Sequence, residues 1–339
     1  MSVPNHPSLI VIGTSAGGMP ALIEVLSQLP ATLPAAVLVV QHLAPTSSSE
    51  FLVERLNEST TLSCHVARHG QHIHAGSVYF CQPDRHLLVK DHHLLVTKGP
   101  HENNFRPAID ALFRSAAVEF GAGVIGVVLT GMLHDGTAGL DFIRRCGGTT
   151  VVQDPREAEF PSMPETALRS LPINYAVPLA RMGHLLEELV RQEITPSTIP
   201  EDLKLEAAIA ERVVGSAEDV EKLGHQVALT CPDCGGTLWQ IDQGRVLRYR
   251  CHTGHSFTAD SLLNRSQDTL EETLWVALRM MEERKNLLTS MASRGEGYWS
   301  VQQEERVNEI KAHINRLREF LLNGKDVDNL AGPTVRHDR

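Results

Sequence analysis

The chain has 339 residues, with 31 Lys and Arg against 41 Asp and Glu, and thus a formal net charge of −10. This length fits one α/β domain with an appendage, and the 42% of hydrophobic residues can form a sizeable core. The acidic balance argues against nonspecific nucleic-acid binding, and no apolar run approaches the roughly 20 residues of a membrane-spanning helix. We therefore expect no nucleic-acid partner and no membrane insertion.

The N-terminus and the cysteines indicate the compartment. The first eight residues are polar and lack the basic segment and long apolar stretch of a signal peptide. Of the six cysteines, three are scattered singly and three have metal-ligand spacing. This usage suits a reducing cytosol better than a disulfide framework, so we expect a cytoplasmic protein.

Short apolar runs alternate with helical patterns in the first half of the chain. Residues 9–12 and 35–40 are typical of buried strands, and each is followed by a helical pattern, at 19–29 and near 51–56. The alternation predicts an α/β fold, doubly wound around a mostly parallel sheet. Three close, short runs instead predict hairpin strands at one sheet edge: 78–80, 87–89 and 94–96. The α/β pattern resumes with a helix at 108–120, a strand at 124–129, a helix at 137–145, strands at 149–153 and 175–177, and a helix at 182–192.

A glycine-rich turn at 13–18 joins the first strand to the first helix. A dinucleotide motif needs a glycine where this chain has Ser15, and an acid at the end of the second strand where it has His42. A serine on a sharp strand-to-helix turn is typical of a nucleophile, because the helix N-terminus offers free N–H groups to an oxyanion. The string Gly-x-Ser-x-Gly is weak alone, and a plain tight turn is the alternative.

Two further polar side chains follow predicted strands. His42 ends the second strand, and Asp135 follows the strand at 126–129. If these strands are parallel neighbours, Ser15, His42 and Asp135 lie on one rim, which is the geometry of a catalytic triad for acyl transfer. Each residue has an alternative interpretation. His42 could be an incidental histidine, since the chain has 17, and Asp135 could simply cap the helix near Thr137. His134, in the same loop as Asp135, is a rival base.

Five sequence blocks together identify a family resemblance. They occur in one order over about residues 8 to 190, and the chain resembles the CheB-type protein-glutamate methylesterases in them: 12–18, 41–45, 105–110, 129–136 and 163–164. The resemblance implies hydrolysis of glutamate methyl esters on the cytoplasmic helices of methyl-accepting chemoreceptors, and deamidation of some glutamines there. It implies no catalytic cofactor. Family members often carry an N-terminal receiver domain; since the first catalytic strand starts at Leu9, we expect none here.

The resemblance also implies roles for individual residues. Ser15 would attack, His42 would act as the base and Asp135 would orient it. Thr14 and Met132 would lie beside the nucleophile, with a backbone N–H near Met132 helping to hold the oxyanion. Two more residues would line the cleft, Arg106 and Met163. Departures from the family pattern at 108 and 133–134 concern substrate preference more than the triad.

A second constellation lies in the C-terminal part. Cys231-x-x-Cys234 and Cys251-x-x-x-His255 flank a strand-like stretch, which predicts a zinc-ribbon-like module with a closed, structural zinc site. His252 competes with His255 for the fourth position, and an unmetallated cysteine pair is the alternative.

The predicted organisation has five parts. Residues 7–193 form the catalytic domain, 194–224 a linker with a helix, 225–258 the zinc-ribbon-like module, 259–323 a helical hairpin and 324–339 a disordered tail. The amphipathic hairpin either packs on itself or on the ribbon, or presents a docking or dimerisation surface for a signalling partner. Two other functions stay open: a non-enzymatic signalling adaptor, and a hydrolase of a small ester or amide.

Overall fold

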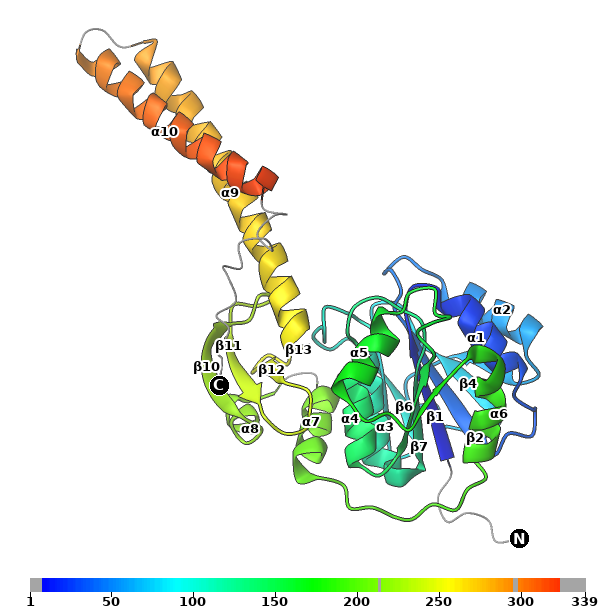
Figure 1. The fold of residues 1–339 in the computed structure, drawn as a ribbon. Helices are drawn as coiled ribbons and strands as arrows, with labels where there is room; N and C mark the ends of the chain where they lie inside the picture. Colours follow the sequence, from blue (N-terminus) through cyan, green and yellow to red (C-terminus); the bar gives the residue numbers. More distant parts are fainter. Residues whose placement is uncertain (1–7, 213–214, 295–297, 324–339) are drawn as a thin grey trace, which may run out of the picture. The chain divides into compact units, whose positions relative to one another are not determined.

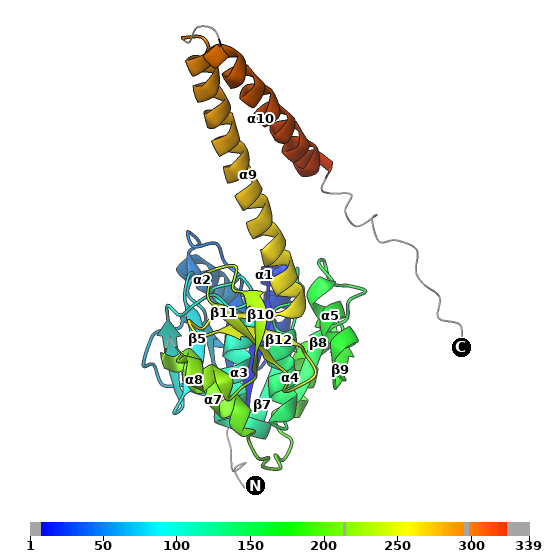
Figure 2. The ribbon, with the colours of Figure 1, turned by 90° about the vertical axis from the view of Figure 1, so that its left-hand side faces the viewer.

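The computed structural model describes residues 8–212, 215–294 and 298–323. These fall into two compact units, Met1–Leu263 and Asn264–Arg339, which Figures 1 and 2 draw from two directions. Among the described residues, no helix combines the length and apolarity needed to cross a membrane. The predicted disordered tail at 324–339 lies outside the described residues.

A parallel sheet of seven strands organises the first unit in the described part of the chain. Every neighbouring pair in it is parallel, as predicted for a doubly wound fold. In spatial order the strands are β3 (Ser63–Val66), β4 (Ser77–Phe80), β2 (Ala35–Gln41), β1 (Ser8–Thr14), β7 (Val124–Val128), β8 (Thr149–Gln153) and β9 (Tyr175–Val177). The chain leaves β1 toward β2 on one side and returns to β7 on the other, so β1 marks the point where the strand order reverses.

Helices cover both faces of this sheet (Figure 1). One face carries α1 (Gly18–Ser27), α2 (Ser49–Ser59) and α6 (Leu179–Leu189). The other carries α3 (Ile109–Phe120), with the short 3₁₀ helix η1 (Gly121–Gly123) after it, α4 (Thr137–Arg145) and α5 (Ser162–Ser170). Burial on both faces explains the continuous apolar runs of the central strands, because no side of them meets water.

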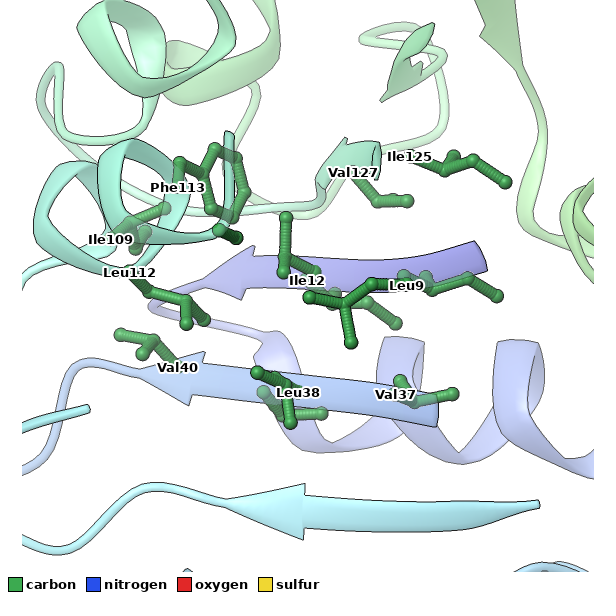
Figure 3. Packing of buried hydrophobic residues seen from close by; sticks show 14 of the residues in the cluster. Leu9, Ile12, Val37, Leu38, Val40, Ile109, Leu112, Phe113, Ile125 and Val127 are labelled. Carbon is green, nitrogen blue, oxygen red and sulfur yellow. The ribbon is translucent and has the colours of Figure 1, made fainter. Parts of the chain in front are cut away.

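The core beneath α3 fixes where that helix begins. Figure 3 shows Ile109, Leu112 and Phe113 of α3 packed toward Ile12 and Val40 of the central strands. Gly13 is part of this contact, because a Cβ atom there would lie 2.3 Å from the Ile109 side chain. The first turn of α3 is therefore pressed onto the end of β1, close to the predicted nucleophile.

The predicted edge hairpin is wrong in its placement. Residues 78–80 belong to β4, a parallel strand inside the main sheet, next to the unpredicted β3. The other two predicted runs do form an antiparallel pair, β5 (His86–Lys90) and β6 (His93–Thr97), but this pair is a separate two-stranded sheet. It packs on α3, where the Val89 N–H donates to Ser115 Oγ at 3.1 Å. A short apolar run is compatible both with a parallel strand of the main sheet and with a hairpin strand, so the sequence did not distinguish the two.

The C-terminal part has the predicted kinds of element. After α7 (Glu201–Arg212) and α8 (Ala217–Glu221), an antiparallel sheet is formed by β10 (His225–Thr230), β11 (Thr237–Ile241), β12 (Arg248–Cys251) and β13 (Ser256–Thr258). We call residues 225–258 the Cys-rich module; it lies within the first compact unit. Two long helices follow, α9 (Ala259–Ala292) and α10 (Tyr298–Asn323). They run side by side where Arg318 pairs with Glu282 at 2.8 Å.

Candidate active site

Three strands end level with one another at the carboxyl edge of the sheet. In the register of β1, Gly13 lies opposite Val40 of β2 and Val128 of β7. The loops that follow these strands therefore start side by side, at the reversal point where parallel α/β sheets bind ligands. Ser15, His42 and Asp135 come from these three loops.

The structure brings the three side chains into one hydrogen-bonded row. Ser15 Oγ lies 3.1 Å from His42 Nδ1, and His42 Nε2 lies 2.8 Å from Asp135 Oδ2. The imidazole is only 6% exposed and the carboxylate is fully buried. With a proton on Nε2 held by the carboxylate, Nδ1 is free to accept the serine proton, which is the arrangement that a general base needs.

The N-terminus of α3 holds the Asp135 carboxylate. Its Oδ2 accepts from the Ile109 N–H at 2.6 Å and its Oδ1 from the Asp110 N–H at 3.2 Å. The residue before the helix, Ala108, offers no side-chain cap, so Asp135 satisfies N–H groups that would otherwise lack partners. The partial positive charge of the helix N-terminus also attracts an acidic side chain to this place. Asp135 does cap a helix, but that helix is α3 and not the one near Thr137.

The turn at 13–18 that carries Ser15 is braced by the loop after β7. The Ser15 N–H donates to Thr130 O at 3.1 Å, and the Gly18 N–H returns to Ser15 O at 3.0 Å. Gly17, the N-cap residue directly before α1, has φ of 72°, a left-handed conformation that glycine adopts without strain. The turn therefore presents the Ser15 hydroxyl at the rim, directly before the N-terminus of α1.

Gly131 leaves no room for a side chain beside Ser15. A Cβ atom there would lie 2.2 Å from Met163 Sδ and 2.8 Å from Ser15 Cβ. We expect Gly131→Ala to push the Ser15 turn aside and to lower kcat roughly 10- to 100-fold, because small displacements of reacting groups are costly. Steady-state ester hydrolysis measures this effect. Gly99→Ala is the control, since a Cβ there meets its nearest atom at an ordinary 3.5 Å; equal losses in both variants would contradict the steric argument.

The remaining predicted residues occupy different environments. Met132 lies on the rim with an exposed side chain, whereas Met163 is fully buried. Thr14 is also fully buried, and its hydroxyl donates to Thr130 O at 2.9 Å, which favours a bracing role for this side chain. Arg106 is held by Asp84, with Nε 2.8 Å from Oδ1, and by Gly99 O.

The rival base is engaged elsewhere. His134 Nδ1 lies 3.3 Å from Thr166 Oγ1, and in the described part of the chain only the His42 ring is hydrogen-bonded to Ser15.

Sequence reasoning assigned no role to three residues that surround the triad, Asn103, Phe105 and Asp110. Phe105 stacks on the His42 ring, with centroids 3.6 Å apart and planes 8° from parallel. Asn103 donates to Asp135 Oδ1 at 3.0 Å and to Asp110 Oδ2 at 2.6 Å. Phe105 and Asp110 lie in one of the five blocks, so the blocks did signal them, whereas nothing in the sequence pointed to Asn103.

Asp110 is a second buried carboxyl group next to Asp135. Burial raises its pKa well above the ordinary value, and the neighbouring charge of Asp135 raises it further. Its Oδ1 accepts from the Gly136 N–H at 3.0 Å and the Gly139 N–H at 2.5 Å, which joins α3 to α4. Two neighbouring buried carboxyl groups disfavour carrying two negative charges at once.

The Cys-rich module gathers four side chains of the types that bind metal ions. The ligand atoms of Cys231, Cys234, Cys251 and His255 all lie within 4.8 Å of one another. Cys234 Sγ is 3.8 Å from Cys251 Sγ, which in turn is 3.5 Å from His255 Nδ1. Tetrahedral zinc with bonds of about 2.3 Å separates its sulfur ligands by about 3.8 Å. His252 is exposed and is not part of the group.

A doubly wound parallel sheet with serine, histidine and aspartate hydrogen-bonded at its carboxyl rim has the layout of a serine hydrolase. The chain belongs to the CheB methylesterase family, whose model matches residues 10–186. The catalytic domain of CheB methylesterase from Thermotoga maritima superposes with a TM-score of 0.52 at 31% identity, and the match covers 54% of this chain and 98% of that structure.

Two curated relatives define the extent of the similarity. A protein-glutamate methylesterase/protein-glutamine glutaminase from Burkholderia lata is 39% identical over 179 residues, which cover 52% of this chain and 49% of the relative. A putative protein of the same description from Leptospira interrogans is 36% identical over 181 residues, 53% of this chain and 93% of the relative. The chain thus spans about half the length of the first relative, and each match covers only about half of this chain.

Proposed function

We propose that this protein is a protein-glutamate methylesterase that uses Ser15 as nucleophile, His42 as general base and Asp135 as the group that orients the imidazole. The hydrogen-bonded row from Ser15 Oγ to the Asp135 carboxylate is the single observation that carries the proposal. The family membership and the names of the two relatives favour a glutamate methyl ester as substrate, with glutamine deamidation as a second activity.

The reaction follows from this geometry. As Ser15 Oγ bonds to the ester carbonyl carbon, its proton passes to His42 Nδ1, and Asp135 stabilises the imidazolium. The carbonyl oxygen becomes an oxyanion beside the Met132 N–H, which donates to no acceptor in the described part of the chain. The imidazolium then protonates the departing methoxide to give methanol. Water, deprotonated by His42, hydrolyses the acyl-serine to a glutamate carboxylate and restores the hydroxyl.

The test is methanol release from a methylated chemoreceptor fragment, run beside a panel of small methyl esters. We expect the full chain to release methanol from the receptor with a kcat/KM well above that for any small ester. Faster hydrolysis of a small ester would move the substrate to that class, and stable binding without methanol release would favour a non-enzymatic adaptor.

We also propose a structural zinc ion held by Cys231, Cys234, Cys251 and His255. Two turns of similar build support it: the Cys231 N–H donates to Gly236 O at 2.7 Å, and the Cys251 N–H donates to His255 O at 3.0 Å. Each turn contains a glycine with positive φ, Gly235 and Gly254. Four protein ligands would leave no open position, so the ion would stabilise the module and take no part in the reaction.

We expect about one zinc ion per chain when metal content is measured by plasma mass spectrometry. Cys231→Ser should remove most of it and destabilise the module, since small metal-bound modules depend on the ion to fold. Cys64→Ser is the matched control, because Cys64 is a buried cysteine of the main sheet with no part in the cluster. A zinc-free native protein, or equal zinc loss in both variants, would contradict the assignment.

Organisation and location stay proposals. The order of the helices and strands, with the end of the family match at 186, supports the proposed division at 193, 224 and 258. Six cysteines free of disulfides support a cytoplasmic location. Exposed apolar side chains on the helical hairpin, such as Trp275 and Leu287, support a signalling partner there.

A further inference from the structure

Residues 102–105 form a tight turn next to the triad. The Phe105 N–H donates to Glu102 O at 2.9 Å, and the Glu102 N–H returns to Phe105 O at 3.2 Å. The two central residues, Asn103 and Asn104, have φ of 51° and 73°, a left-handed conformation that asparagine tolerates better than most residues. One end of the turn carries Phe105, whose ring stacks on His42. The turn therefore bears directly on the general base.

The Asn103 side chain faces the triad with one end and the Cys-rich module with the other. Its Nδ2 donates to Asp135 Oδ1 and Asp110 Oδ2, and its Oδ1 accepts from the Thr258 N–H of β13 at 2.9 Å. The opposite orientation of the Asn103 amide would place its oxygen against two carboxyl groups and its NH₂ group against the Thr258 N–H. These contacts therefore fix the orientation of the amide. Asn103 is 5% exposed, so water offers it few alternative partners.

The same turn meets the module at adjacent points close to the metal-ligand cluster. The Asn103 N–H donates to Ser256 O at 2.8 Å, and Ser256 directly follows the ligand His255. His101 contributes a ring nitrogen within 4.8 Å of the His255 ligand atom. The position of β13 beside the turn therefore depends on residues that neighbour the proposed zinc site.

A buried ion cluster joins the same parts. Glu102 pairs with Arg114 of α3 at 2.6 Å and with Arg250 of β12 at 3.7 Å. Burial alone would raise the pKa of Glu102, but the charges of Arg114 and Arg250 outweigh it and hold the pKa at about 2. Glu206 of α7 likewise accepts from Arg248 of β12 at 2.6 Å. Because a buried charge without its partner is costly, the cluster favours one docked position of the module.

We propose that Asn103 is a positioning residue for the catalytic carboxylate and that β13 of the Cys-rich module holds it in place, so that the module completes the active site. This inference rests on the hydrolase function proposed above. Three hydrogen bonds to Asp135, from the Ile109 and Asp110 N–H groups and from His42, do not involve the module. The fourth donor is the Asn103 amide, whose orientation depends on its hydrogen bond with the Thr258 N–H of β13. Loss of the module's order therefore loosens the carboxylate, and with it the imidazole on which Phe105 stacks.

The first experiment compares Asn103→Gly with Asn104→Gly in the full chain. Glycine keeps the left-handed backbone in both variants, and only position 103 contacts Asp135. We expect Asn103→Gly to lower kcat roughly 10- to 100-fold with little change in KM, while Asn104→Gly stays within about twofold of wild type. Amide hydrogen exchange at Ile109 and Asp110, the donors to Asp135, should speed up in Asn103→Gly alone. Equal behaviour of the two variants would overturn the proposal.

The second experiment tests the link to the module through a double-mutant cycle with Cys231→Ser. If β13 acts through Asn103, the double variant should be little worse than the worse single variant, because the two changes remove the same support. Effects that multiply would show that the module and Asn103 act independently, and this result would refute the coupling. Exchange at Ile109 and Asp110 should show the same non-additivity.

The exchange readout separates this inference from the proposed function. A wild-type chain that hydrolyses no ester, yet whose Ile109 and Asp110 amides lose protection in Asn103→Gly and Cys231→Ser, would defeat the esterase and retain the coupling. An active wild type with unchanged exchange and kcat in both variants would retain the esterase and defeat the coupling.

Discussion

Replacing Ser15 by alanine should lower the rate of methanol release by at least about 10⁴-fold, since loss of a catalytic nucleophile removes the covalent path and leaves only oxyanion and binding contributions. The variant keeps the hydrogen bonds of the turn, because these involve the backbone of residue 15. Substrate binding should therefore persist while kcat collapses, which a binding measurement on methylated receptor would detect.

Ser27→Ala provides the control for Ser15→Ala. Ser27 is an exposed serine at the end of α1 whose hydroxyl bonds only to Glu24 O in the described part of the chain. It should retain wild-type activity. A Ser15→Ala enzyme within tenfold of wild type would remove Ser15 from the reaction.

Replacing Asp135 by asparagine should lower kcat about 10⁴-fold, because a neutral amide no longer enforces the productive histidine tautomer or stabilises the imidazolium. The carboxylate accepts on both oxygens, from His42 and Ile109 at Oδ2 and from Asn103 at Oδ1. An amide has one oxygen, so its NH₂ group must oppose donors on one side, at a cost of about 1–3 kcal/mol of stability.

Part of that stability loss is offset at Asp110. Burial is the larger cause of the raised pKa of Asp110, and the charge of Asp135 is the second. Because a neutral residue at position 135 removes that second cause, it lowers the cost of ionising Asp110. We therefore expect Asp135→Asn to fold, with a thermal transition only a few degrees lower. Asp141→Asn is the control, since Asp141 is a buried carboxylate that accepts from the Arg245 N–H and lies outside the triad. A similar fall in kcat for both variants would point to a general loss of structure.

The sequence predicted that Ser15, His42 and Asp135 would meet because each follows a predicted strand of a parallel sheet and lies in one of the family blocks. Apolar runs covered on both faces indicated parallel strands, and parallel strands end at one rim. Ser15, His42 and Asp135 therefore converge as expected. Which imidazole nitrogen faces which partner depends on the exact approach of each loop, and a residue pattern carries no information about it.

The contacts around the triad were beyond prediction for a different reason. Asn103 reads as an ordinary loop residue, and its role depends on β13, which is more than 150 residues away in the chain. Glu102 and Glu206 carry charges that usually lie at the surface, yet here they are buried with arginines from α3 and β12. Such clusters form only after distant segments pack. The match to the family blocks could not reveal them either, because the Cys-rich module lies beyond the matched residues.

The hydrolase assignment depends on an activated Ser15 hydroxyl, and a serine-reactive fluorophosphonate tests this most directly. The full chain would be incubated with the probe, digested and mapped by mass spectrometry. We expect one phosphonyl adduct on the peptide that contains Ser15, formed rapidly in the wild type and suppressed in His42→Ala. An unmodified Ser15 in folded protein, or labelling that is indifferent to His42, would contradict the triad.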